Sequence, residues 1–270
     1  MIETPWLQRV SAPRRAVYRA LRAASFACRA GSRALDRLAA GTLTAADLRA
    51  AQLDEWRSFN ATADQTGTGL MPWEERFYDT CLAPGDRILL IGCGAGRDLI
   101  ALARRGICVD GVEPVPELAA AGRTHAAQHD VATTITTAAF GGDSTVSAYD
   151  AYVFSYFCYT YIRGAASRID ALRAIRRAAP NARVLVSAPA RESARELGFR
   201  FVRLGNLLGA ADWRAERGDV FGIDESLGCP RYYHAFTEPQ LEEEMRAGGF
   251  RISRRIEDVE LQLVEAVADV

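Results

Sequence analysis

The chain has 270 residues, enough for one large domain or for a domain with an appendage. Its content of 49% apolar and 25% charged residues is ordinary for a soluble globular protein, and no apolar run approaches the length of a membrane span. The net charge of −1 is unevenly distributed. Residues 1–50 hold nine arginines and three acids (net +6), whereas residues 51–270 hold 24 arginines and 31 acids (net −7).

The cysteines and histidines do not predict a metal centre. The six cysteines contain no CxxC pair and no repeated spacing, which is typical of reduced thiols in a cytoplasmic protein. His125 and His129 lie four residues apart on an expected helix, a spacing that could hold a metal. Because no third ligand accompanies them, we favour an exposed helix face.

The first seventy residues predict helices. An apolar stripe surrounded by arginines follows Pro13 and consists of Val17, Leu21, Ala24 and Cys28. Gly31 is expected to interrupt this helix and Gly41 to end it. Thr44 and Asp47 then form a loose capping box for a further helix.

Three interpretations of this segment stay open: a transit peptide, a surface that binds anionic lipid or an anionic substrate, and a helical lid. We favour a lid over residues 1–70, whose apolar stripe packs on the rest of the chain or on a second subunit, so that a homo-oligomer is possible. Residues 67–69 (Gly-Thr-Gly) would form its hinge.

The most informative stretch runs from Asp86 to Glu113. Residues 88–91 are an unbroken apolar run, as expected of a parallel strand covered on both faces. Three glycines follow at alternate positions: Gly92, Gly94 and Gly96. A helical pattern comes next, and residues 108–112 then predict a second strand with Glu113 at its end. This order is typical of half a nucleotide-binding α/β unit.

The glycine spacing separates two ligand classes. The dinucleotide fingerprint places its third glycine three positions after the second, and here that position holds Arg97. The pattern is instead G-x-G-x-G, with Glu113 seventeen residues after Gly96. The loop therefore favours a nucleoside that lacks a pyrophosphate.

This stretch resembles the class I S-adenosylmethionine-dependent methyltransferases, and the resemblance extends over residues 71–270. It implies that S-adenosylmethionine is the cofactor, with its methionine part against the loop and both ribose hydroxyls donating to Glu113. The cofactor contacts it implies are Gly92, Cys93, Gly94, Ala95, Gly96, Glu113, Pro114, Ala139, Phe140, Ser155 and Trp73.

Residues 133–137 and 151–154 are expected to be the third and fourth strands. Related enzymes often place an acid after the third strand, but this chain has Ala139 and Phe140 there, with Asp143 three residues beyond Phe140. Either Phe140 covers the adenine ring or the strand is longer than expected. The end of the fourth strand should border the transferred methyl group, with these substrate contacts: Tyr156, Phe157 and Tyr159. A packed aromatic core is an equal alternative for these residues, as it is for Trp73.

The acceptor is expected to be a small molecule. The Asn/Asp-Pro-Pro-Tyr signature of enzymes that methylate nucleic-acid bases is missing, and the acidic charge of residues 51–270 disfavours a phosphate backbone as partner.

The predicted fold class is α/β, a Rossmann-like, seven-stranded, mostly parallel sheet whose last strand is antiparallel, plus the N-terminal helical extension. Residues 71–270 would form the cofactor-binding domain, and residues 190–230 an insertion that caps the substrate. One helical face of the insertion carries Leu197, Phe201, Leu204 and Leu208. Residues 220–221 and 232–236 are expected to pair as a hairpin, and Thr237 to cap the last helix with Gln240.

The predicted activity is methyl transfer to this acceptor by in-line displacement. His234 is the histidine nearest the expected site and a candidate general base; otherwise it packs against the hairpin. Two other functions stay open: an NAD-dependent oxidoreductase, which Arg97 disfavours, and a non-catalytic regulatory protein that binds S-adenosylmethionine.

Overall fold

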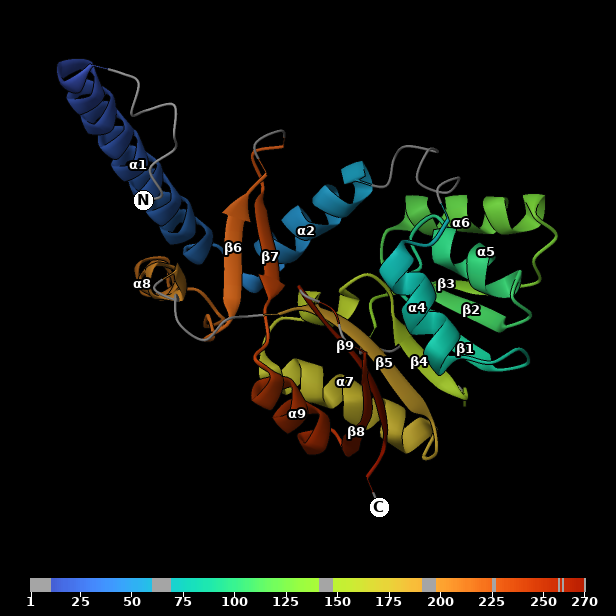
Figure 1. Ribbon diagram of the computed structural model, residues 1–270. Coiled ribbons are helices and arrows are strands. Elements are labelled where there is room, and N and C mark those ends of the chain that lie inside the picture. Colours follow the sequence, from blue (N-terminus) through green and yellow to red (C-terminus); the bar gives the residue numbers. More distant parts are fainter. Residues whose placement is uncertain are drawn as a thin grey trace.

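The computed structural model describes residues 11–59, 69–140, 148–190, 198–224, 227–256, 258 and 260–269 (Figure 1). Its centre is a seven-stranded sheet in the order β3-β2-β1-β4-β5-β9-β8. The strands are β1 (Arg87–Ile91), β2 (Cys108–Glu113), β3 (Ile135–Thr137), β4 (Ala151–Phe154), β5 (Arg183–Pro189), β8 (Phe250–Ile256) and β9 (Leu261–Ala268). The pairs among β1 to β5 are parallel, and β9 runs antiparallel to both β5 and β8. The predicted fold class is confirmed.

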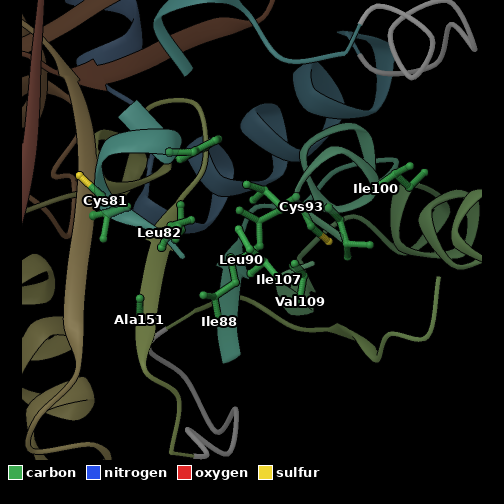
Figure 2. Packing of buried hydrophobic residues seen from close by; sticks show 14 of the residues in the cluster. Cys81, Leu82, Ile88, Leu90, Cys93, Ile100, Ile107, Val109 and Ala151 are labelled. Carbon is green, nitrogen blue, oxygen red and sulfur yellow. The ribbon is translucent and has the colours of Figure 1, made fainter. Parts of the chain in front are cut away.

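Strand β1 is buried on both faces, as its unbroken apolar run predicts. Ile88 and Leu90 belong to one apolar cluster, whereas Leu89 and Ile91 belong to another across the sheet. Figure 2 shows the first cluster, in which Cys93 continues the row of Ile88 and Leu90 toward the glycine loop. The loop therefore starts from a strand that packing holds in place on both sides.

Helices cover both faces of the sheet (Figure 1). One face carries α4 (Pro72–Cys81), α5 (Arg97–Ala103) and α6 (Pro116–Gln128), which contribute to the first cluster. The other face carries α7 (Ala165–Ala178) and α9 (Glu238–Ala247), which contribute to the second.

The remaining elements form a separate group beside the sheet, which we call the accessory unit. It consists of α1 (Ala12–Gly41), α2 (Ala45–Phe59), α8 (Gly198–Leu208) and a hairpin of β6 (Asp219–Ile223) and β7 (Pro230–His234). These elements share their own buried cluster of Ala40, Leu48, Val202, Ala215, Phe221 and Tyr232. The N-terminal extension and the insertion therefore fold together, which the sequence did not predict.

Glycines allow α1 and α8 to approach closely. A Cβ on Gly205 would lie 2.2 Å from the carbonyl oxygen of Leu38 and 2.8 Å from the Cα of Gly41. Asn206 adds a hydrogen bond from its side-chain amide to the Gly41 carbonyl at 2.9 Å.

Local expectations in the N-terminal segment have mixed outcomes. The capping box is confirmed, because the Thr44 amide donates to Asp47 Oδ2 at 3.0 Å and the Asp47 amide donates to Thr44 Oγ1 at 3.1 Å. The expected interruption at Gly31 is wrong, since α1 runs through it. One glycine costs a helix only about 1 kcal/mol, and its alanine and arginine neighbours are strong helix formers.

The expected packing of the α1 stripe on the rest of the chain is also wrong. Val17, Leu21, Ala24 and Cys28 are exposed, and only the C-terminal end of α1 is buried. Packing on a second subunit stays a prediction. The proposed hinge residues 67 and 68 lie outside the described residues, as does Leu197.

The expected cap of the last helix is absent: Thr237 stands before α9, but its side chain makes no capping hydrogen bond. None of the described helices is both long and apolar enough to span a membrane.

Candidate functional site

The glycine loop connects β1 to α5 at the carboxyl edge of the sheet. Gly92, Gly94 and Gly96 have φ values of 76°, 53° and 93°, a left-handed conformation that disfavours residues with a Cβ. The amides of Gly92 and Cys93 both donate to the carbonyl of Val112, at 2.8 and 3.2 Å. The loop is thereby fixed to the end of β2, one strand away.

Glu113 closes the loop from the end of β2. Its carboxylate is buried, and Oε2 accepts a hydrogen bond from the Gly94 amide at 2.9 Å while Oε1 accepts one from the Val115 amide at 2.9 Å. Burial raises the pKa of Glu113, and these two N–H donors oppose the rise. The glycine loop and the acid that were expected to meet are therefore in contact, with Pro114 half-buried beside them.

The segment after β4 folds onto the glycine loop. Tyr156 and Phe157 have positive φ values of 35° and 66°, and a 3₁₀ helix, η2 (Cys158–Tyr161), follows. The Sγ of Cys158 lies 2.1 Å from the position that a Cβ on Gly92 would occupy. Burial raises the pKa of the Cys158 thiol well above its usual range, which is typical of a cysteine that fills space. Cys93, in the loop itself, is buried and has a raised pKa for the same reason.

Two hollows lined by the described residues lie away from the glycine loop. They measure about 260 and 720 Å³ and are lined by residues of α9, β8, β9 and the turn between the two strands. The space over Gly92 is occupied by Cys158 in this arrangement.

Three aromatic side chains gather beside the loop. Trp73, on α4, stacks on Phe157 with ring centroids 5.8 Å apart and planes 3° from parallel. Tyr156 lies 4.7 Å from Phe157 and 6.2 Å from Trp73 between centroids, and it is partly exposed. We call Trp73, Tyr156 and Phe157 the aromatic wall.

Tyr159 does not join this wall. It is fully buried, donates to Glu244 Oε2 at 3.1 Å and packs against Phe154 and Phe236. Glu244 in turn accepts hydrogen bonds from the buried guanidinium of Arg168. Tyr159 is therefore surrounded as a core residue is, which is the alternative that the sequence left open.

A buried polar group beside the loop escaped the sequence analysis. We call it the acid–arginine cluster; its members are Glu74, Tyr78, Arg97, Asp98 and Ser155. Arg97 contacts Glu74 through Nη2 and Asp98 through Nε, the latter at 2.6 Å. Asp98 Oδ2 also accepts from Ser155 Oγ at 2.6 Å and from the Tyr78 hydroxyl at 3.4 Å.

The ionised form of Glu74 is disfavoured in this cluster. Burial, and then the nearby charge of Asp98, raise the pKa of Glu74 to about 7, although the Met71 amide and Arg97 favour its ionised form. The resemblance places Ser155 at the cofactor. Arg97 is notable in the sequence only because it occupies the position of the third glycine of the dinucleotide fingerprint. The sequence signal for a site role of Arg97 is its position directly after the glycine loop.

The residues expected near adenine lie at the end of β3. Ala139 is exposed, and Phe140 is half-buried with its ring edge-on to Phe154 at 5.5 Å. Asp143 lies outside the described residues.

His234 belongs to the hairpin, as the alternative interpretation has it. Its ring is fully buried, with Nδ1 2.7 Å from Asp219 Oδ1 and Nε2 2.9 Å from the side-chain nitrogen of Gln240. A general base must reach its acceptor, and here both ring nitrogens are engaged. The geometry supports a role in holding β7 to β6 and α9.

Among the described residues, Glu216, Asp219 and His234 are the group whose ligand atoms lie within 4.8 Å of one another. Their oxygens are already used. Glu216 accepts from the Ala165 amide and Arg168, and Asp219 accepts from the Tyr232 hydroxyl and the Glu216 amide. Because Arg168 already supplies positive charge there, we interpret the group as a hydrogen-bond network. The spaced histidines also have other partners: His125 contacts the Ala95 carbonyl, and His129 contacts Arg104.

Helix α2 reaches from the hairpin toward the glycine-loop side of the sheet (Figure 1). Glu55 pairs with Arg231 of β7 at 2.7 Å, and Arg57 pairs with Glu117 of α6 at 3.1 Å. Between them, Trp56 contacts the ring of Tyr161 edge-on at 5.4 Å. Within the extension, α2 is thus the helix that contacts the segment folded over the loop.

Comparison with known proteins is informative at the level of structure. No protein-family model matches the sequence, and no curated protein matches it either. Solved structures do match. A S-adenosylmethionine-dependent methyltransferase from Methanosarcina mazei has a TM-score of 0.57 at 20% identity, covering 74% of this chain and 98% of its own. The CcbJ methyltransferase from Streptomyces caelestis has a TM-score of 0.57 at 15% identity, covering 76% and 92%.

A third match is the 1,6-didemethyltoxoflavin-N1-methyltransferase of Burkholderia thailandensis, with a TM-score of 0.54 at 16% identity, covering 83% of this chain and 87% of its own. The likeness to each of these three structures extends over about three quarters or more of this chain. The chain therefore has the fold of the S-adenosylmethionine-dependent methyltransferases.

Proposed function

We propose that this chain transfers a methyl group from S-adenosylmethionine to a small-molecule acceptor. The observation that carries the proposal is the 2.9 Å hydrogen bond from the Gly94 amide to Glu113 Oε2, because it joins a carboxylate at the end of one strand to a glycine loop at the end of its neighbour. Ligands of open α/β sheets bind at this edge, outside the carboxyl ends of the strands.

Glu113 fits the ribose of this cofactor, and the glycine loop beside it fits the methionine part. Each oxygen of Glu113 accepts one backbone hydrogen bond and keeps a further lone pair, so the carboxylate can accept from a vicinal diol. The glycines present backbone without Cβ atoms beside it. Because Cys158 Sγ lies over Gly92, a bound ribose requires the segment after β4 to shift.

The acid–arginine cluster fits the amino-acid end of the cofactor, which carries a carboxylate and an ammonium. Arg97 offers a guanidinium, the side chain best suited to a carboxylate, and its side chain is 21% exposed. Asp98 and Glu74 are carboxylates able to accept from an ammonium.

When bound, S-adenosylmethionine supplies a methyl group already activated on a sulfonium sulfur. The chain then has chiefly to align the acceptor and exclude water, and alignment of two reactants contributes about 7–11 kcal/mol. The aromatic wall and α2 with its Trp56–Tyr161 contact are suited to this, since they place apolar surface beside the loop.

The neighbours in fold support a small molecule as the acceptor. The toxoflavin enzyme is crystallised with 1,6-didemethyltoxoflavin and S-adenosylhomocysteine, and a glycopeptide N-methyltransferase, MtfA, with S-adenosylmethionine. Both structures support the same cofactor here and an organic small molecule as acceptor. An NAD-dependent oxidoreductase is disfavoured because Arg97 is engaged with two carboxylates where that class has its third glycine.

Isothermal calorimetry with S-adenosylhomocysteine tests the cofactor site. The wild-type chain should bind it and should not bind NADH. Glu113→Ala should weaken S-adenosylhomocysteine binding by about tenfold or more, because charge-assisted hydrogen bonds to the ribose are lost. Glu117→Ala is the matched control, since Glu117 is an exposed acid on α6.

Equal affinities of the two variants would place the ribose elsewhere, and binding of NADH alone would identify the oxidoreductase. Mass spectrometry of a metabolite panel incubated with labelled methyl donor separates an enzyme from a regulatory protein: binding without any labelled product would favour the latter.

A further inference from the structure

Helix α1 carries its charge and its apolar surface on different sides. At 100° per residue, Arg15, Arg22, Arg29 and Arg33 fall along one side. Val17, Leu21, Cys28 and Leu35 fall along another. The helix contains seven arginines and one acid, Asp36. It is amphipathic and strongly basic over thirty residues.

The apolar side of α1 has no partner among the described residues. Leu21 is 65% and Leu35 66% exposed, and Phe26, 70% exposed, stands among the arginines. In Figure 1 the N-terminal part of α1 extends away from the other elements.

Helix α8 adds a second exposed apolar surface next to the buried end of α1. Its inward side, with Val202, Gly205 and Asn206, packs on the other elements of the accessory unit. Its outward side exposes Phe201, Leu204, Leu207 and Leu208, with Leu207 81% exposed. We call α1 and α8 together the helical arm. Most large apolar side chains exposed by the described residues lie on this arm.

Charge decides what covers this surface. Arg22, Arg29 and Arg33 form no ion pair with any residue that the structure describes, so the arm presents an excess of positive charge. A second copy of α1 packed on the apolar side would cover that side but would leave the arginines on the other side without a counter-charge. An anionic bilayer complements both features, because its headgroups attract arginine and its acyl region accepts apolar side chains.

We propose that the helical arm docks on an anionic lipid surface, with α1 lying in the plane of the interface. The arginines contact lipid phosphates, and the apolar side of α1 enters the acyl boundary. This inference rests on the arm alone and is independent of the proposed methyl transfer.

Vesicle flotation of the full chain tests the proposal. The wild-type chain should float with vesicles of phosphatidylcholine mixed with phosphatidylglycerol, and much less with phosphatidylcholine alone. The triple variant Arg22→Gln, Arg29→Gln, Arg33→Gln should bind the anionic vesicles about tenfold or more weakly. The double variant Val17→Ser, Leu21→Ser should also lose binding, since the apolar side no longer inserts.

A matched control removes the same charge from the sheet domain: Arg104→Gln, Arg177→Gln, Arg251→Gln. These three arginines are exposed at the end of α5, on α7 and on β8, none of which belongs to the arm. This variant should bind vesicles as the wild type does. Far-ultraviolet circular dichroism and thermal unfolding verify that every variant folds. Three outcomes overturn the proposal: no preference for anionic vesicles, equal loss in the control, or a stable dimer in sedimentation that Val17→Ser, Leu21→Ser dissociates without effect on flotation.

Discussion

Burying a carboxylate is costly unless hydrogen-bond donors replace the lost water, and the three acids around the glycine loop meet this condition to different degrees. Glu113 accepts two backbone N–H bonds. Asp98 accepts from Arg97, Ser155 and Tyr78. Glu74 shares Arg97 with Asp98 and faces that acid's charge, so it is the least compensated of the three.

This imbalance predicts a pH dependence of stability. Burial raises the pKa of Glu74 from 4.5 to about 7, so between these values the folded chain keeps a proton that the unfolded chain has released. The free energy of unfolding therefore falls as the pH rises through this window. Because glutamine does not titrate, the stability of Glu74→Gln lacks this pH-dependent contribution.

Urea denaturation of the wild type and Glu74→Gln across this window checks the sign. The wild type should lose stability relative to the variant as the pH rises. Glu75→Gln, at an exposed acid in the same turn, should show no such trend against the wild type. A difference between wild type and Glu74→Gln that stays flat, or grows in favour of the wild type with pH, would contradict the assignment.

At the scale of elements, the contact between α1 and α8 depends on single glycines. A Cβ at Gly205 would lie within 3 Å of backbone atoms of Leu38 and Gly41, and backbone cannot move aside as a flexible side chain can. Gly205→Ala should therefore cost about 1–3 kcal/mol, the usual penalty of overpacking.

Gly31→Ala is the matched control within α1. Nothing lies within 4 Å of a Cβ at Gly31, so the change should raise stability by up to about 1 kcal/mol through helix propensity alone. Thermal unfolding of the two variants measures both effects. If Gly205→Ala unfolds at or above the wild-type temperature, α1 and α8 do not pack as described.

Local signals explain which elements the sequence could predict. Gly92, Gly94 and Gly96 were recognisable because a left-handed backbone selects glycine whatever surrounds it. Strand β1 was recognisable because burial on both faces demands an apolar run. The expected pairing of residues 220–221 with residues 232–236 as a hairpin is confirmed, with Val220 opposite Tyr233.

Contacts between distant segments explain what the sequence could not show. Asn206 bonds to Gly41 across 165 residues, and no local pattern on α1 or α8 indicates that partner. The same holds for Arg97 and Glu74, 23 residues apart, and for His234, whose burial follows from Asp219 and Gln240. Each of these contacts forms only in the tertiary structure, so the residue types and their local spacing do not predict it.

The molecule as a whole combines an acidic sheet domain with a basic helical arm. Helix α2 forms ion pairs with β7 of the accessory unit and with α6 of the sheet domain. The proposed cofactor site and the proposed docking surface thus lie on separate parts of the chain. The segment after β4 contacts both α2 and the glycine loop, so we expect it to shift if the proposed cofactor binds over Gly92.

Hydrogen exchange with and without saturating S-adenosylhomocysteine tests this assignment over the whole chain. The amides of Gly92–Gly96 should exchange more slowly in the complex, because bound ligand excludes water from them. The amides of Cys158 and Thr160 should exchange faster, since their turn hydrogen bonds to Ser155 and Phe157 belong to the arrangement in which Cys158 covers Gly92. Residues 12–33 of α1 serve as the internal reference and should not change. Protection confined to the hollow along β8 and β9 would move the cofactor to that side of the molecule, away from Glu113.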